Sequence, residues 1–259
     1  MKYPEKVSNY IVSWINNYVN ESGVKGLVVG ISGGVDSALT STLCAKTGQD
    51  VLCLEMPIYQ NKDQVLRSRK HIDWLKTNFQ NVTSKKIELD KTFESFVSSL
   101  PNNSSDKHEL SLANTRSRLR MVTLYYFSGL YNYIVAGTGN KVEDFGIGFY
   151  TKYGDGGVDI SPIADLLKSE VFSLAKFHNI INEIIVAEPN DGLWNDNRSD
   201  EDQIGASYEE IENAMINYDN KENLSQREKD VLKIYYSFNI ANKHKMDPIP
   251  VCKIPKEYL

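Results

Sequence analysis

Apolar residues follow a helical period near the start of the chain and then gather in short runs typical of buried strands. The helical positions, three or four residues apart, are Val7, Tyr10, Ile11, Trp14, Tyr18 and Val19. Gly23 and Gly26 mark the expected end of this helix, because glycine readily ends helices. The aliphatic runs predict strands at 27–31, 51–56, 86–89 and 133–136.

Segments with helical periodicity separate these strands and dominate the chain after residue 160. The separating segments are 37–47, 61–78, 91–99 and 109–128, and the later ones are 165–178, 207–217 and 225–241. Strands that alternate with helices indicate a doubly wound parallel sheet. We therefore expect an α/β fold with a helical C-terminal part, in a single domain over residues 1–259. Two polar segments without periodicity, 101–108 and 188–203, are expected to be mobile loops.

The most informative segment joins the first predicted strand to the next helix and reads Gly26-Leu-Val-Val-Gly-Ile-Ser-Gly-Gly-Val-Asp-Ser37. Its glycines let the backbone turn sharply and expose N–H groups, and the start of the helix adds a partial positive charge. Such a loop is suited to hold phosphate. Asp36 would repel a bare anion, so its presence indicates a metal ion that accompanies the phosphate. The segment predicts a site for a nucleoside triphosphate with magnesium.

Three other motifs overlap this segment. A Walker A loop needs a lysine before Ser37, and a dinucleotide fingerprint needs a glycine spacing that is not present. Gly30-Ile-Ser32-Gly-Gly34 does match the Gly-x-Ser-x-Gly turn that carries the nucleophile of α/β hydrolases. That turn would here follow the first strand, which leaves no upstream segment for the usual oxyanion loop. A hydrolase with Ser32 as nucleophile is therefore a minor alternative.

A second glycine turn with an acid follows the strand that ends at Ala136, in the sequence Gly137-Thr-Gly-Asn-Lys-Val-Glu143. Ligands of open parallel sheets bind beyond the carboxyl ends of the strands, where the strand order reverses. If the first and last strands are neighbours there, Asp36 and Glu143 would face one cleft and could share a magnesium ion. The spacing alone is equally compatible with Glu143 as an ordinary acid at the start of a helix.

Composition narrows the class of protein. The net charge of −5 argues against nucleic acid as the main partner. No apolar run approaches the length of a membrane span, and the N-terminus lacks a signal-peptide core. Cys44 and Cys53 lie in apolar stretches and are expected to be core residues, and with Cys252 they form no Cys-x-x-Cys pair, so a cytoplasmic location is expected.

Basic residues are placed unevenly along the chain. We expect Arg67, Arg69 and Lys70 to lie on a solvated helix face. The basic residues of the middle third lie near the glycine turns and are expected to favour anions: Arg116, Arg118, Arg120, Lys141, Lys152 and Lys168.

The segment Ser32-Gly-Gly-Val-Asp-Ser37 resembles the pyrophosphatase loop of the N-type ATP pyrophosphatases, and further motifs resemble those of the NAD synthetases. These are Asn114-Thr-Arg-Ser-Arg-Leu-Arg-Met121, Gly137-Thr-Gly-Asn-Lys-Val-Glu143, Thr151-Lys-Tyr-Gly-Asp-Gly-Gly-Val-Asp159, the acidic stretch Ser199-Asp-Glu-Asp202 and the pair His244-Lys245. The ordered set spans nearly the whole chain and is far more specific than any one motif. The resemblance implies the adenine nucleotide alpha hydrolase-like form of the doubly wound sheet.

The resemblance also implies roles for individual residues. ATP would be bound by Gly30, Ile31, Ser32, Gly33, Gly34, Val35, Asp36, Ser37, Thr138, Lys168 and Asn190. Deamido-NAD would be bound by Arg118, Lys152, Asp159, His244 and Lys245, and magnesium by Asp36 and Glu143. No covalent protein nucleophile is expected. Two positions depart from the family: Asn190 stands where a hydroxyl residue is usual, and Met246 where an arginine is common.

The implied activity is that of a ligase that amidates deamido-NAD with ammonia and consumes ATP, the last step of NAD biosynthesis. The chain reaches its ATP loop within 32 residues, so we expect no attached glutaminase domain and expect free ammonia as the nitrogen source. Two alternatives stay open: another amide-forming ATP pyrophosphatase, such as the ATPase subunit of a GMP synthetase, and a non-catalytic nucleotide-sensing dimer.

The long predicted helix at 109–128 has more apolar surface than one helix face needs against a sheet. Its apolar residues are Leu110, Leu112, Leu119, Met121, Val122, Leu124, Tyr125, Tyr126 and Phe127. The family resemblance implies a homodimer joined partly through this helix.

Overall fold

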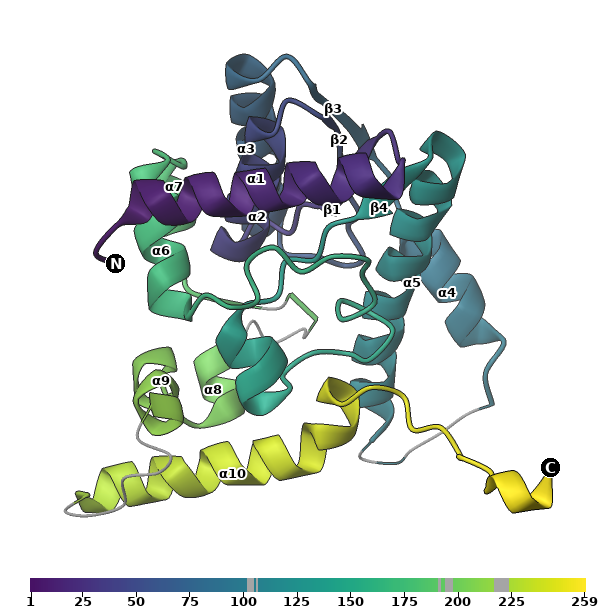
Figure 1. Cartoon of the computed structure of the whole chain (residues 1–259), viewed down its shortest axis with the longest axis vertical. Helices are drawn as coiled ribbons and strands as arrows, with labels where there is room; N and C mark the ends of the chain where they lie inside the picture. Colours follow the sequence, from purple (N-terminus) through teal and green to yellow (C-terminus); the bar gives the residue numbers. More distant parts are fainter. Residues whose placement is uncertain (102–104, 106, 191, 194–197, 217–223) are drawn as a thin grey trace.

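A computed structural model describes residues 1–101, 105, 107–190, 192–193, 198–216 and 224–259. The strands are β1 (Gly26–Gly30), β2 (Asp50–Glu55), β3 (Val82–Lys86) and β4 (Tyr133–Val135). The α-helices are α1 (Pro4–Ser22), α2 (Val35–Lys46), α3 (Lys62–Asn78), α4 (Asp90–Ser98), α5 (His108–Tyr131), α6 (Lys168–Phe177), α7 (Asn182–Ile185), α8 (Asp200–Ile204), α9 (Tyr208–Ile216) and α10 (Gln226–Met246). A π-helix, η1 (Val142–Ile147), and a short 3₁₀ helix, η2 (Lys256–Tyr258), complete the described elements (Figure 1).

The four strands form one parallel sheet in the order β3-β2-β1-β4. The chain therefore winds outward from β1 in both directions, which confirms the expected doubly wound sheet. β1 lies beside β4, with Gly26 paired to Tyr133 and Val28 to Val135. The glycine turns after these two strands consequently lie at the same edge of the sheet.

The third predicted strand was placed wrongly. The structure has β3 at Val82–Lys86 instead of 86–89. This strand lies at the edge of the sheet, where Val82 is its only buried residue and the others face solvent wholly or in part. An edge strand of this kind needs few apolar residues, so hydrophobic patterning misses it.

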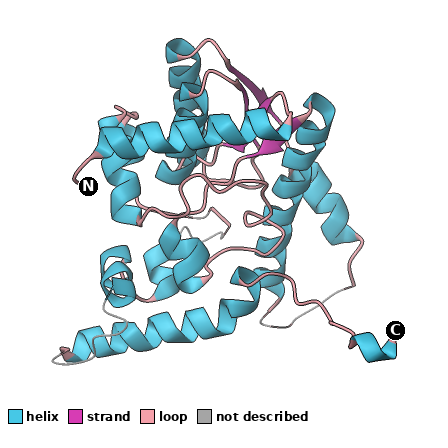
Figure 2. Ribbon diagram, viewed as in Figure 1, coloured by secondary structure: helices cyan, strands magenta, loops and turns pink. Residues whose placement is uncertain are grey.

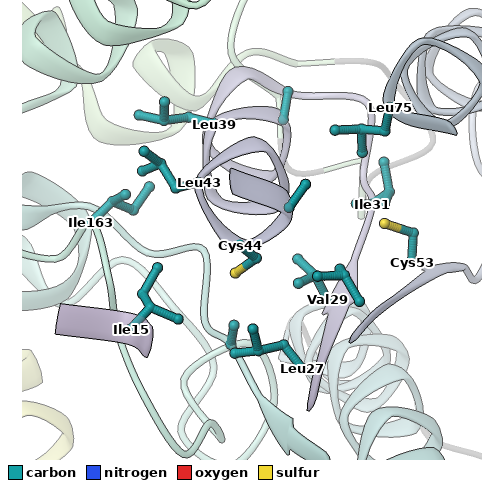
Figure 3. Close-up of a cluster of buried hydrophobic side chains, with 14 of the residues drawn as sticks. Ile15, Leu27, Val29, Ile31, Leu39, Leu43, Cys44, Cys53, Leu75 and Ile163 are labelled. Carbon is teal, nitrogen blue, oxygen red and sulfur yellow. The ribbon is translucent and has the colours of Figure 1, made fainter. Parts of the chain in front are cut away.

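Helices cover both faces of the sheet (Figure 2). Alternate residues of a strand point to opposite faces, so Leu27 and Val29 pack with α1, α2 and α6, while Val28 packs on the other side with Phe93 of α4 and Phe127 of α5. Figure 3 shows the first of these clusters, in which side chains from α1, β1 and α2 meet around Leu43 and Cys44. The burial of Cys44 and Cys53 in this cluster confirms that they are core residues.

A separate apolar cluster forms the helical C-terminal part. It joins η1, α8, α9 and α10 through residues such as Ile147, Ile211 and Val231. In Figure 1 these helices lie below the sheet, with α10 along the lower side of the molecule. These helices therefore face the carboxyl ends of β1 and β4.

The segments 101–108 and 188–203 include residues outside the described ones, so their expected mobility stays a prediction. Among the described helices, none has the length and apolar character that crossing a membrane requires.

Candidate active site

A cleft of about 250 Å³ opens where β1 and β4 end. All eleven residues that were predicted to bind ATP line this cleft, and so does Glu143. The expected convergence of the two glycine turns is therefore confirmed. The cleft is also lined by Asp200 of the acidic stretch 199–202, and by residues that the sequence did not single out, such as Gln60, Gln64 and Asp144.

Two serine side chains, Ser32 and Ser37, fix the conformation of the loop between β1 and α2 through hydrogen bonds. Ser37 Oγ donates to the Gly34 carbonyl at 3.0 Å and accepts from the backbone N–H of Ser32 at 3.2 Å. The two hydroxyl oxygens are 3.0 Å apart. Helix α2 begins directly after Gly34 without a side-chain cap. Its first N–H groups are thus left for a ligand, as in an anion site at a helix N-terminus.

The geometry around Ser32 does not favour the hydrolase alternative. Ser32 Oγ bonds to Ser37 Oγ and accepts from the Gly34 N–H. The histidines that contact serines are the buried His71 and the half-buried His178, which pair with Ser41 and Ser8 instead. Within the described part of the chain, no histidine bonds to Ser32, so the hydroxyl has no base to activate it.

Helix α3 packs against the back of this loop. Ser68 Oγ donates to the Ile31 carbonyl at 2.9 Å, and Arg67 Nε donates to the Gly33 carbonyl at 3.2 Å. The expectation of a solvated face was wrong for Arg67, which is half-buried and lines the cleft. It was wrong because the i, i+4 pattern of a helix does not reveal which polar residue meets a neighbouring loop.

Gly33 should not tolerate a side chain. Its φ is +86°, and a Cβ there would lie 2.4 Å from the Gln64 carbonyl oxygen. Gly33→Ala is expected to combine about 1–3 kcal/mol of backbone strain with about 1–3 kcal/mol of overpacking, and to weaken ATP binding. Urea unfolding and ATP titration measure both effects.

Gly48→Ala is the matched control for this substitution. Gly48 also has a positive φ, +78°, but a Cβ there would meet nothing within 4 Å. The Gly48→Ala variant should lose only the stability that backbone strain costs, and it should bind ATP as tightly as the unmodified protein. Equal losses of stability in the two variants, with ATP binding retained in both, would contradict the role of Gly33.

Lys168 joins the two acids that were predicted to bind magnesium. Its Nζ lies 2.7 Å from Asp36 Oδ2 and 2.9 Å from Glu143 Oε1. The lysine side chain is only 4% exposed. Burial lowers the pKa of the Lys168 ammonium, but the two carboxylates outweigh burial and raise it above its ordinary value. The group between the acids is therefore a cation.

Asn140 links the segment that carries Asp36 to the segment that carries Glu143. It is fully buried; its Nδ2 donates to Asp36 Oδ1 at 3.0 Å, and its Oδ1 accepts from the N–H groups of Val142 and Glu143. It thereby caps the π-helix η1 that carries Glu143. An asparagine just before a helix start is a capping signal, so the residue could have been found from the motif Gly137-Thr-Gly-Asn140.

Asp144 follows Glu143 in η1 and also lines the cleft. Burial and, to a smaller extent, the carboxylates of Glu143, Asp155 and Asp36 together raise its pKa to about 8. Wide π-helical turns are frequent at functional sites. Here the turn presents two adjacent carboxyl groups to the cleft.

Asn190 reaches the cleft from the segment after α7. Its Nδ2 donates to the Arg198 carbonyl and its Oδ1 accepts from the Gly192 N–H at 2.7 Å. Gln64 Nε2 donates to the Asn190 carbonyl at 3.1 Å. The amide thus ties its own segment together and to α3, a role that the usual hydroxyl could fill only in part. Its predicted contact with ATP stays a prediction.

The residues predicted to bind deamido-NAD lie outside this cleft and fall into two groups. Arg118 donates to the Lys152 carbonyl at 3.3 Å, and Lys152 Nζ donates to the His244 carbonyl, so these three form one exposed edge. Asp159 and Lys245 instead hold the backbone. Asp159 accepts from Tyr125 and from the Val135 N–H, and Lys245 Nζ donates to the carbonyls of Gly148 and Tyr150.

Known proteins resemble this chain in sequence and in architecture. A family model described as NAD synthase matches residues 7–247. The NH(3)-dependent NAD(+) synthetase of Carboxydothermus hydrogenoformans is 38% identical over 214 residues, which are 82% of this chain and 85% of that protein. The structure of NMN synthetase from Francisella tularensis has a TM-score of 0.83 at 30% identity and covers 98% of both chains.

The NH3-dependent NAD synthetase from Campylobacter jejuni, in complex with the nitrate ion, has a TM-score of 0.78 at 28% identity, with 96% of this chain and 99% of that chain covered. The family model and the relative from Carboxydothermus hydrogenoformans each span more than two thirds of the sequence. The chain therefore belongs to the NAD synthase family.

Proposed function

We propose that this protein amidates deamido-NAD with ammonia and converts ATP to AMP and pyrophosphate. The observation that carries the proposal is the cleft at the ends of β1 and β4, where the phosphate loop Ser32–Ser37 meets Glu143 and Lys168. Membership of the NAD synthase family and the NH(3)-dependent relatives support the choice of reaction.

The reaction has two steps, transfer of the adenylyl group to the acid and then transfer of the acyl group to ammonia. A carboxylate oxygen of the pyridine acid attacks the α-phosphorus of ATP, and the bond to the β-phosphate oxygen breaks to release pyrophosphate. Ammonia then attacks the carbonyl carbon of the resulting mixed anhydride, loses a proton, and AMP leaves. The loop N–H groups and the start of α2 would hold the phosphates, and the ammonium of Lys168 would offset the charge of the departing pyrophosphate. No protein nucleophile is needed.

We propose Mg²⁺ as the cation that accompanies ATP, with Asp36 and Glu143 as its protein ligands. Among the described residues, no group of three or more His, Cys, Asp or Glu side chains is arranged to hold a metal by itself. Two carboxylates that already converge on one ammonium do suit an ion whose remaining ligands are water and phosphate oxygens. When bound, such an ion polarises the phosphoryl oxygens.

We propose that deamido-NAD lies along the exposed edge formed by Arg118, Lys152 and His244. Two of these side chains carry positive charge that suits a pyrophosphate group. The edge adjoins the cleft through Ser117, which lines the cleft beside Arg118 in the sequence. Asp159 and Lys245 would act indirectly, because their polar atoms hold the backbone beside this edge.

We also propose a homodimer that uses α5, and a cytoplasmic location. Val122, Tyr126 and Leu130 are each more than half exposed on this helix, at intervals of four residues. Gly129 stands in the same helix, where a Cβ would meet nothing within 4 Å, so packing within the chain does not require a glycine there. A monomeric mass in light scattering at micromolar concentration would contradict the dimer.

The cysteines favour the proposed cytoplasmic location. Cys44, Cys53 and Cys252 form no disulfide, which supports a reducing compartment.

A second candidate function is the same ATP-dependent amidation with a different acid substrate. The Francisella tularensis neighbour is named an NMN synthetase and matches over 98% of both chains. The corresponding substrate here would be nicotinic acid mononucleotide, and the product would be NMN. The ATP cleft serves either acid equally, because adenylation involves only the pyridine carboxylate and the α-phosphate.

One assay tests these proposals together. Purified protein is mixed with ATP, Mg²⁺, ammonium or glutamine, and one of three acids: deamido-NAD, nicotinic acid mononucleotide or xanthosine monophosphate. Equal amounts of NAD, AMP and pyrophosphate are expected from deamido-NAD with ammonium. A larger kcat/KM for the mononucleotide would move the assignment to NMN formation, and product from xanthosine monophosphate alone would indicate a GMP synthetase. No amide from any acid would overturn the proposed reaction.

A further inference from the structure

Tyr208 is a buried tyrosine whose hydroxyl lies among the acidic groups of the cleft. It is the first residue of α9 and is only 6% exposed. Its hydroxyl oxygen lies 2.6 Å from Glu143 Oε1 and 3.2 Å from Asp200 Oδ2. The Lys168 ammonium lies 4.6 Å from the centre of its ring, within range of a cation–π contact. One side chain therefore contacts both Glu143 and the lysine that binds Glu143.

The hydroxyl must act as a donor toward Glu143. A phenol of ordinary pKa, about 10, keeps its proton at neutral pH, and the carboxylate oxygen that it faces at 2.6 Å is an acceptor. A phenol has one proton to donate. The shorter distance assigns that proton to Glu143 Oε1, which also accepts from Lys168 Nζ at 2.9 Å. Among the bonds of the described residues, none reaches Glu143 Oε2.

The packing of the ring does not account for the hydroxyl. The ring belongs to the apolar cluster of η1, α9 and α10, and a phenylalanine would fill that space equally well. A hydroxyl buried without partners would be unfavourable, but this one lies between two carboxylates. Helix α8 also holds the start of α9, because Glu201 Oε1 accepts from the Tyr208 N–H at 2.8 Å. The residue is thus fixed by its backbone and by its ring, with its hydroxyl directed at Glu143.

We propose that Tyr208 is a positioning residue that holds Glu143 Oε1 and so directs the free oxygen of this carboxylate toward the cation bound with ATP. This inference rests on the proposed role of Glu143 as a metal ligand. Hydrogen-bond partners of metal ligands typically contribute 10–100-fold to metal affinity or activity. Tyr208 would contribute in that way without touching a substrate.

Tyr208→Phe tests the proposal because it removes only the hydroxyl and keeps the ring over Lys168. Mn²⁺ replaces Mg²⁺ as the probe, and free Mn²⁺ is measured by electron paramagnetic resonance in the presence of α,β-methylene ATP, which cannot release pyrophosphate. The dissociation constant for Mn²⁺ is expected to rise about 10–100-fold. In turnover, the Mg²⁺ concentration that gives half the maximal rate should rise by a similar factor, and kcat should largely recover at saturating Mg²⁺.

Tyr133→Phe is the matched control. The Tyr133 hydroxyl also donates to a carboxylate, Asp50 at 3.3 Å, but β4 and β2 begin there, at the end of the sheet opposite the cleft. This variant should bind Mn²⁺ as the unmodified protein does. Titrations are normalised to the folded fraction from circular dichroism, so partial unfolding changes the number of sites and leaves their dissociation constant measurable.

The results separate this inference from the proposed function. If Tyr208→Phe binds Mn²⁺ normally while Glu143→Gln does not, the positioning role of Tyr208 is overturned and the metal role of Glu143 stands. If Glu143→Gln also binds Mn²⁺ normally, the metal assignment fails and the inference fails with it. A loss in Tyr208→Phe that is matched in Tyr133→Phe would likewise overturn the inference.

Discussion

Replacing Asp36 by asparagine is expected to slow pyrophosphate release about a thousandfold, which corresponds to about 4 kcal/mol in the barrier. The substitution keeps the shape of the side chain and removes its charge. Asp36 Oδ2 lies 2.7 Å from Lys168 Nζ, and its Oδ1 accepts from Asn140 Nδ2 at 3.0 Å. A neutral amide in this position could neither balance the lysine nor bind Mg²⁺ strongly, so the charge on the phosphates would be poorly compensated.

The measurement is pyrophosphate release in a single turnover with saturating ATP, Mg²⁺ and the acid substrate. Asp165→Asn is the control, because the Asp165 side chain is 98% exposed and pairs with Lys141 outside the ATP cleft. Circular dichroism should show that both variants stay folded, since Lys168 keeps its bond to Glu143 when Asp36 is replaced. Unimpaired pyrophosphate release from folded Asp36→Asn would refute the metal assignment.

The side of the cleft that the loop 32–37 forms could be predicted from the sequence because the residues of this loop are close together in the chain. The turn at Gly33 and the helix that starts after Gly34 are next to each other in the chain. One short motif is therefore enough to predict a phosphate-binding loop. Glu143 needed one further step, the pairing of β1 with β4. That step followed from the general rule that parallel sheets bind ligands where strand order reverses.

The rest of the site could not be predicted because its contacts join distant segments. Tyr208 lies 65 residues beyond Glu143 and reads in the sequence as an ordinary helix residue. Arg67 reads as a surface residue until α3 is seen to pack on the loop. The predicted deamido-NAD residues Asp159 and Lys245 share motifs with the family, but motifs do not show that their polar atoms hold the backbone.

Replacing Lys168 by methionine is expected to lower the free energy of unfolding of the ligand-free protein by about 3 kcal/mol at pH 8, the usual scale for removing one partner of a buried ion pair. The loss should shrink at pH 5. Burial raises the pKa of Glu143, the charge of Lys168 lowers it, and Asp36 raises it again. Without the lysine, the pKa of Glu143 in the folded variant must rise further above the unfolded value of about 4.3.

The sign of the pH dependence follows from proton binding. Between the unfolded and folded pKa values of Glu143, the folded variant holds a proton that the unfolded chain has released. Its free energy of unfolding therefore falls as the pH rises through that window and recovers as the pH drops. Urea unfolding from pH 5 to pH 8 measures the difference from the unmodified protein.

Added Mg²⁺ distinguishes a general loss of packing from a loss of charge between the two acids. Without nucleotide, Mg²⁺ should stabilise Lys168→Met more than the unmodified protein, because the ion can take the place of the ammonium between Asp36 and Glu143. Lys141→Met is the control, since Lys141 forms an exposed pair with Asp165 and such pairs contribute less than about 1 kcal/mol. A loss in Lys168→Met that is independent of both pH and Mg²⁺ would mean that altered packing around the new side chain, and not the missing charge, destabilises the variant.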